Sequence, residues 1–147
     1  MGVEMKERFL FRAKKTEKDE WIVGYLIGDV FSSNPGCVYI ISEKGCYVVD
    51  HNTICQCIGA RDRNGNLIFE NDVVKHYNDC EHPEYYTFGV ITWDEHTLAY
   101  YRSSEYDLVA HLRDSLTYEV VGNTVDEPDL LDKIRQGKNS DGGKENG

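Results

Sequence analysis

Apolar residues recur along the chain in runs of strand length, and short polar stretches separate these runs. Residues 8–15 and 20–30 are two such runs on either side of a polar stretch, a pattern that predicts a β-hairpin. Residues 38–42 and 46–50 repeat the pattern, with Gly45 between them to take the positive φ of a tight turn. The first fifty residues therefore predict an N-terminal β-hairpin region.

The middle of the chain continues with alternating apolar and polar positions that are rich in β-branched and aromatic residues. Asn64-Gly65 is the strongest hairpin signal of the sequence. The predicted strands are residues 53–60, 66–77, 85–93, 97–104 and 116–124. The chain shows no internal repeat and no alternation of strands with helices, so the pattern predicts a mainly β fold, either a barrel or a sandwich.

The C-terminal part predicts a short helix over residues 126–137. Pro128 suits its first turn, acidic residues gather at its beginning, and Gly137 marks its end. The spacing of two leucines also predicts a short helix over residues 103–112. Residues 137–147 contain no apolar side chain, and we expect them to form a disordered tail.

Four segments, taken together, resemble the YopX family of phage- and prophage-encoded bacterial proteins. The segments are residues 11–26, 57–74, 89–94 and 119–131, and the resemblance spans about residues 9–131. In the segment 57–74, called the motif segment below, a Gly, a basic–acidic pair, Asn-Gly and an aliphatic–aromatic pair precede an acidic turn and a valine run. Four positions depart from the family pattern, which usually has Thr at Ile58 and Gly at Asn71 and rarely has Cys at Cys55 or Cys57. Asn tolerates a left-handed backbone, so the turn can survive.

The resemblance implies a mainly β fold with a small SH3-like barrel and subunits that assemble into oligomers. It implies no established catalytic residue and no cofactor. We accordingly expect a β-hairpin region over residues 1–50, an SH3-like barrel with its C-terminal helix over 51–136, and the tail. A barrel of this size has exposed strand edges, which also favours a homo-oligomer.

The motif segment carries two candidate carboxylates, Glu70 and Asp72. If they alternate on one strand, their side chains share a face and could serve as an acid–base pair in a metal-assisted hydrolase. The interpretation that we prefer is structural, because acids beside a hairpin commonly accept hydrogen bonds from the backbone amides of a turn. The residues predicted to form this structural turn are Asp62, Asn64, Gly65, Glu70 and Asp72.

Cysteine and histidine recur with one spacing, His-x₃-Cys-x-(Cys/His), in residues 51–57 and 76–82. Zinc prefers such nitrogen and sulfur ligands, so the weak candidate ligands are Cys55, Cys57, His76, Cys80 and His82. No Cys-x-x-Cys pair accompanies them. We therefore expect no metal, and we expect one of Cys55 and Cys57 to pack in the core while the other faces outward.

The net charge of −10 is concentrated in the second half of the chain, where residues 76–147 hold fifteen acidic and six basic residues. Such a surface repels phosphate backbones, which disfavours the alternative of a nucleic-acid accessory protein. Trp93, Tyr100 and Tyr101 stand among these acids. We expect them to contribute to an interaction surface, because Tyr and Trp are enriched where proteins meet.

The function predicted from the sequence is a non-catalytic, acidic protein-interaction module that binds itself and a host or phage protein. The five cysteines and the absence of a signal-like or membrane-spanning apolar stretch favour a cytoplasmic location. No phosphate-binding loop and no nucleophile motif is present. We expect no cofactor and no membrane partner.

Overall fold

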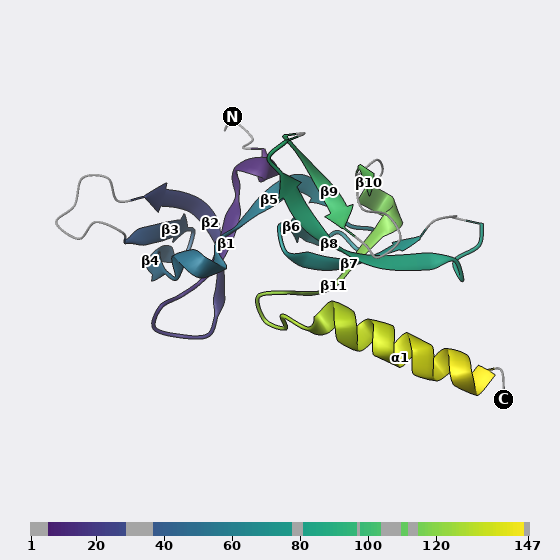
Figure 1. The fold of residues 1–147 in the computed structure, drawn as a ribbon. Coiled ribbons are helices and arrows are strands. Elements are labelled where there is room, and N and C mark those ends of the chain that lie inside the picture. The colour runs from purple at the N-terminus through teal and green to yellow at the C-terminus, as the bar shows by residue number, and fades with distance from the viewer. Residues whose placement is uncertain are drawn as a thin grey trace. The chain divides into compact units, whose positions relative to one another are not determined.

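The computed structural model is mainly β, with two antiparallel sheets and one C-terminal helix (Figure 1). It describes residues 6–28, 37–77, 81–96, 98–103, 110–111 and 115–145. Within these ranges, side chains are not described at 101–103, 110–111, 115 and 138–145. The predicted mainly β class, the N-terminal hairpin strands and the C-terminal helix are confirmed.

The strands match the apolar runs of the sequence, because β-branched and aromatic residues suit a pleated, half-buried surface. They are β1 (Phe11–Lys14), β2 (Trp21–Gly28), β3 (Val38–Ser42), β4 (Gly45–Val49), β5 (Cys55–Arg61), β6 (Leu67–Phe69), β7 (Asp72–Tyr77), β8 (Tyr86–Asp94), β9 (Ala99–Ser103), β10 (Ala110–His111) and β11 (Tyr118–Asn123). Short 3₁₀ turns lie at η1 (Glu7–Phe9), η2 (His51–Thr53) and η3 (Ser115–Thr117), and the helix is α1 (Leu130–Glu145).

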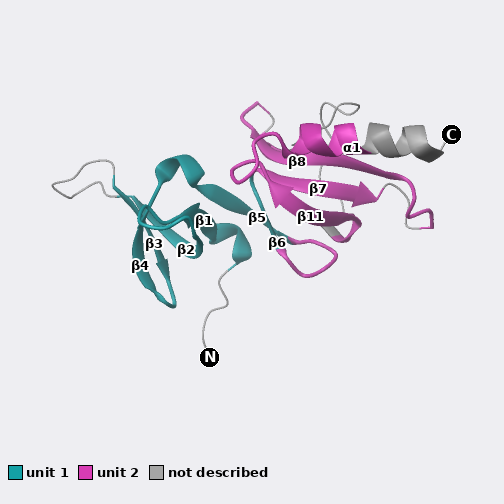
Figure 2. Cartoon of the chain, turned by 90° about the horizontal axis from the view of Figure 1, so that it is seen from below, with its two compact units in different colours: residues 1–60, 67–70 teal, residues 61–66, 71–147 magenta. Residues whose placement is uncertain are grey.

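The chain forms two compact units, shown in different colours in Figure 2. Unit 1 comprises Met1–Ala60 and Leu67–Glu70, and unit 2 comprises Arg61–Asn66 and Asn71–Gly147. This division differs from the predicted boundary near residue 50. Strand β5 belongs largely to unit 1 because it pairs with β1, through Phe11 with Gln56 and Arg12 with Cys55.

The sheet of unit 1 has the strand order β4-β3-β2-β1-β5-β6. Its core takes one buried side chain from each of the first four strands, Ala13, Ile22, Ile40 and Val49. Gly24 lies on the same face of β2 and is required there, since a Cβ would stand 2.1 Å from the backbone oxygen of Ile41. The close approach of β2 and β3 therefore depends on this glycine.

Strands β1 to β4 curl round this core, and the far end of β4 returns to β1. Lys15 and Val49 form an isolated β-bridge, the amide of Thr16 donates to the Val48 oxygen at 3.2 Å, and the amide of Asp50 donates to the Lys14 oxygen at 2.9 Å. The SH3-like barrel over residues 51–136 stays a prediction.

The sheet of unit 2 has the order β10-β9-β8-β7-β11. Its buried residues include Val73 and Val74 of β7, Ile91 of β8 and Tyr118 of β11. Helix α1 begins beside this sheet, where Leu130 fills the space in front of Gly122; a Cβ there would lie 2.4 Å from the Leu130 side chain.

The structure differs from the sequence prediction at three places. The predicted strand 66–77 is interrupted by a turn at Glu70 and Asn71. The helix expected over 103–112 falls mostly outside the described residues, and its end is instead strand β10, which pairs with β9. Helix α1 continues past Gly137 to residue 145, because a glycine without a positive φ weakens a helix by about 1 kcal/mol but does not end it.

None of the helices in the described part of the chain is both long enough and apolar enough to cross a membrane.

Candidate functional site

Glu70 holds strand β5 by both its backbone and its side chain. The amide of Glu70 donates to the oxygen of Gln56 at 2.9 Å, and the amide of Gln56 donates to Oε1 of Glu70 at 2.9 Å. Arg12 reaches the Glu70 carbonyl at 3.5 Å while its guanidinium lies between the rings of Trp21 and Phe69, at 4.7 and 4.8 Å from their centroids. The carboxylate is thus one part of a local network within unit 1.

Asp62 is the acceptor at the centre of the Asn-Gly turn. Its side chain is buried, with 1% of its area exposed. Oδ1 accepts the amides of Asn64 and Asn66, each at 2.9 Å, and Oδ2 accepts the amide of Val120 at 2.9 Å. Gly65 completes the turn with a φ of +84°.

The ionised form of Asp62 is the one that this arrangement stabilises. Burial alone would raise the pKa of Asp62, but the hydrogen bonds from the amides of Val120, Asn66 and Asn64 outweigh it. The pKa therefore lies below its ordinary value of 3.8. A carboxylate with a lowered pKa that already accepts three amides is poorly suited to take a proton from a substrate.

Asn71 separates the two carboxylates that the sequence suggested as a pair. Its φ of +70° confirms the left-handed backbone expected where the family usually has Gly. Its amide donates to the Ile91 oxygen at 2.9 Å, and its own oxygen accepts the amide of Thr124 at 2.9 Å. Glu70 therefore lies in a turn, whereas Asp72 is the buried first residue of β7, and the two do not alternate on one strand.

Cys55 and Cys57 share one face of β5, and both are fully buried. The expectation that one of them faces outward is wrong, because both side chains lie on the same side of β5 and that side is buried at these two positions. His76 stacks on Tyr118 at 4.6 Å between ring centroids, and exposed His82 lies 3.2 Å from Glu84.

Among the described residues no three His, Cys, Asp or Glu side chains gather closely enough to hold a metal ion. Cys80 lies outside the described residues. The weak zinc candidates of the sequence are thus placed in different surroundings: two buried in β5, one stacked on a tyrosine and one paired with a glutamate.

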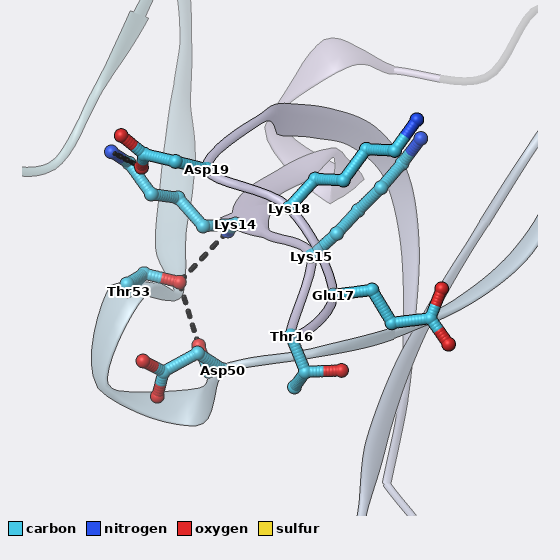
Figure 3. Close-up of a pocket in the computed structure, with 8 residues that line it drawn as sticks. All are labelled: Lys14, Lys15, Thr16, Glu17, Lys18, Asp19, Asp50 and Thr53. Carbon is cyan, nitrogen blue, oxygen red and sulfur yellow. Dashed lines mark hydrogen bonds and ion pairs between the residues drawn. The ribbon is translucent and has the colours of Figure 1, made fainter.

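A shallow pocket of 370 Å³ lies at the turn between β1 and β2 (Figure 3). Its lining residues are Lys14, Lys15, Thr16, Glu17, Lys18, Asp19, Asp50 and Thr53. Lys14 is ion-paired with Asp19, and the Lys14 amide donates to Oγ1 of Thr53 at 2.8 Å. The lining holds three lysines and three carboxylates, so the pocket favours neither an anion nor a cation.

Trp93 and Tyr100 of the predicted interaction surface are brought together by the β8–β9 pairing. Their rings meet edge to face with centroids 4.8 Å apart, and Trp93 is 40% exposed. Tyr101 pairs with Thr92 through its backbone, and its side chain is not among those described.

A larger apolar surface lies on unit 1, on the side of β2, β3 and β4 that faces away from the core. We call it the outer face; it consists of Val23, Tyr25, Ile27, Tyr39, Ile41, Cys46 and Val48. Cross-strand pairing arranges it in rows, since Tyr25 is opposite Ile41 and Ile27 is opposite Tyr39, while β4 continues the rows with Cys46 and Val48. Five of its side chains expose between 39% and 44% of their area.

Sequence reasoning missed the outer face, although a signal for it was present. Residues 21–27 are apolar at nearly every position rather than at every second one. A half-exposed antiparallel strand normally alternates apolar and polar residues. An uninterrupted apolar run in a hairpin therefore indicates that both faces of the strand meet apolar surroundings.

Comparison with known protein families gives a match over most of the chain. The family model described as YopX protein matches residues 10–132. None of the curated proteins compared with the chain matches it.

Proposed function

Because the chain belongs to the YopX protein family, we propose that it is a non-catalytic protein-interaction module that assembles with copies of itself. One observation carries the proposal: strands β2 to β4 of unit 1 carry apolar side chains on both faces, and one of these faces is exposed. Contiguous apolar patches of this kind on a folded protein mark interaction sites.

The carboxylates of the motif segment support the non-catalytic part of the proposal. Asp62 and Glu70 accept hydrogen bonds from backbone amides, and with Asn64, Gly65 and Asp72 they serve to fix the turns on either side of β6. A metal-assisted hydrolase based on Glu70 and Asp72 is less favoured, because a turn separates these two residues.

The proposal includes a phage or prophage origin, a cytoplasmic location and a second kind of partner. The family resemblance implies a phage or prophage protein, and the cysteine usage of the sequence favours the cytoplasm. A host or phage protein is the second kind of partner. The acidic second half of the chain disfavours nucleic acid in this role.

Size-exclusion chromatography with light scattering tests self-association, over at least a hundredfold range of protein concentration. We expect a mass that is a multiple of the 16.9 kDa chain and that falls toward one chain on dilution. A mass of one chain at every concentration would contradict the proposal.

A further inference from the structure

The outer face has the composition of a buried interface rather than of a solvated surface. Its seven side chains carry no charge, whereas the neighbouring strand β1 places Arg12 and Lys14 against the ring of Trp21 at its border. Charged residues are depleted at interface cores and aromatic residues are enriched there. The border between apolar and charged side chains follows the line between β2 and β1.

The apolar area of the outer face matches what a stable dimer requires. Five side chains that each expose about two fifths of their surface provide on the order of 400 Å². A standard interface buries about 800 Å² on each partner, of which somewhat more than half is apolar. The outer face therefore supplies most of the apolar area that such an interface needs.

The outer face is not flat, because part of it lines a groove. The groove has a volume of 800 Å³. Its lining includes Val23, Tyr25 and Ile41 of the outer face, together with Glu43 and Lys44. Ile27 and Val48 belong to the outer face but not to the groove, so the same face offers both projecting side chains and a hollow to receive them.

The charge distribution favours a second copy as the occupant. The chain carries −10, and most of the excess lies in residues 76–147, so two copies that met through that half would repel each other. An uncharged face can meet itself without such repulsion. At the rim of the groove, Glu43 and Lys44 have opposite signs, which suits contact with an identical rim.

We infer that the outer face of unit 1 is the surface through which two copies of this chain bind each other, the exposed apolar side chains of one copy entering the groove of the other. This inference rests on the proposed function and identifies its partner and its surface. The contact is isologous, so every residue of the face is used twice.

Charge placed on the outer face tests the inference. Ile41→Glu puts two carboxylates into the dimer interface, and we expect it to raise the dissociation constant at least 100-fold, as Ile27→Glu should also do. Val121→Glu is the matched control, because Val121 lies on β11 of unit 2 and is 43% exposed, against 44% for Ile27. The control should assemble like the unchanged chain.

Cys46 provides a second measurement on the unchanged chain. It is an exposed thiol on the outer face. Maleimide labelling, assigned to Cys46 by peptide mass spectrometry, should be slow in the assembled protein and become at least tenfold faster on dilution. If circular dichroism shows that the Ile41 and Ile27 variants do not fold, the labelling rate of Cys46 alone tests whether the outer face is the dimer interface.

Failure of the proposed function and failure of this inference give different results. A chain that is monomeric at all concentrations overturns both the proposed function and this inference. A chain that assembles, whose folded Ile41→Glu variant assembles as well as Val121→Glu and whose Cys46 reacts at one rate at all concentrations, overturns the inference alone.

Discussion

The amide of Val120 donates a hydrogen bond to Oδ2 of Asp62 across 2.9 Å, although 58 positions separate the two residues in the chain. Val120 belongs to β11, the last strand of its sheet. The amide of Arg63 adds a bond to the Tyr118 oxygen at 2.9 Å. The Asn-Gly turn therefore covers part of the outer edge of β11, and an edge with occupied amides is a poor template for another strand.

Asp62→Asn should lower the free energy of unfolding by about 2–4 kcal/mol, because the buried side chain would keep one oxygen where three backbone amides need two. Urea unfolding followed by circular dichroism measures the loss. Asp50→Asn is the control. Asp50 accepts the amide of Asn52 at an exposed 3₁₀ turn, where Asn caps equally well, so its effect should stay within about 0.5 kcal/mol. Equal losses in the two variants would contradict the role given to Asp62.

The contribution of Asp62 to the free energy of unfolding should decrease as the pH falls. Its pKa is lowered in the folded state, so as the pH falls the unfolded chain takes up the proton first. The difference in unfolding free energy between the unchanged chain and Asp62→Asn should be constant at neutral pH. It should begin to shrink near the ordinary pKa of 3.8 and continue to do so as the pH falls through the folded-state value. If the difference in unfolding free energy grew on acidification, the pKa of Asp62 would be raised in the folded state rather than lowered.

Glu70 gives a test that separates a structural from a catalytic carboxylate. Glu70→Gln keeps an oxygen for the Gln56 amide, and we expect it to cost less than about 1 kcal/mol of stability. Glu70→Ala removes the acceptor and should cost about 1–2 kcal/mol more. Thermal and urea unfolding of the two variants measure this order. If Glu70→Gln were as damaging as Glu70→Ala, the hydrogen bond to Gln56 would not be the reason for the carboxylate.

The strands could be predicted from the sequence because their signals are local. Gly45 and Gly65 have a positive φ in the two hairpin turns, as the sequence indicates. The apolar runs on either side of these turns form β3 to β6. Which strands pair over long distances could not be predicted in this way. The contact of β5 with β1 joins parts of the chain that the sequence assigned to separate regions.

The candidate surface was harder to foresee than the turns. The acidity of the motif segment makes Glu70 and Asp72 the candidate pair, yet the left-handed Asn71 between them interrupts the strand on which they would alternate. The outer face is invisible to a search for reactive residues because it consists of ordinary apolar side chains. Only the cross-strand register shows that Tyr25, Ile41 and Cys46 form one row.

The backbone of Asn71 has a φ of +70°, which few residues adopt without strain. Asn71→Val should lower the free energy of unfolding by about 1–3 kcal/mol, because a β-branched side chain is strained at a left-handed φ. Asn71→Gly should stay within about 1 kcal/mol of the unchanged chain, since glycine accepts the conformation but gains entropy in the unfolded state.

The hydrogen bonds of Asn71 to Ile91 and Thr124 run through its backbone, so both variants can keep them and the comparison isolates the backbone conformation. Urea unfolding of the two variants gives the required order. A Val variant as stable as the Gly variant would mean that the turn relaxes to a negative φ. Because this turn leads directly into β7, such relaxation would also shift the register of Asp72 with Asn123, which amide hydrogen exchange at β11 would reveal.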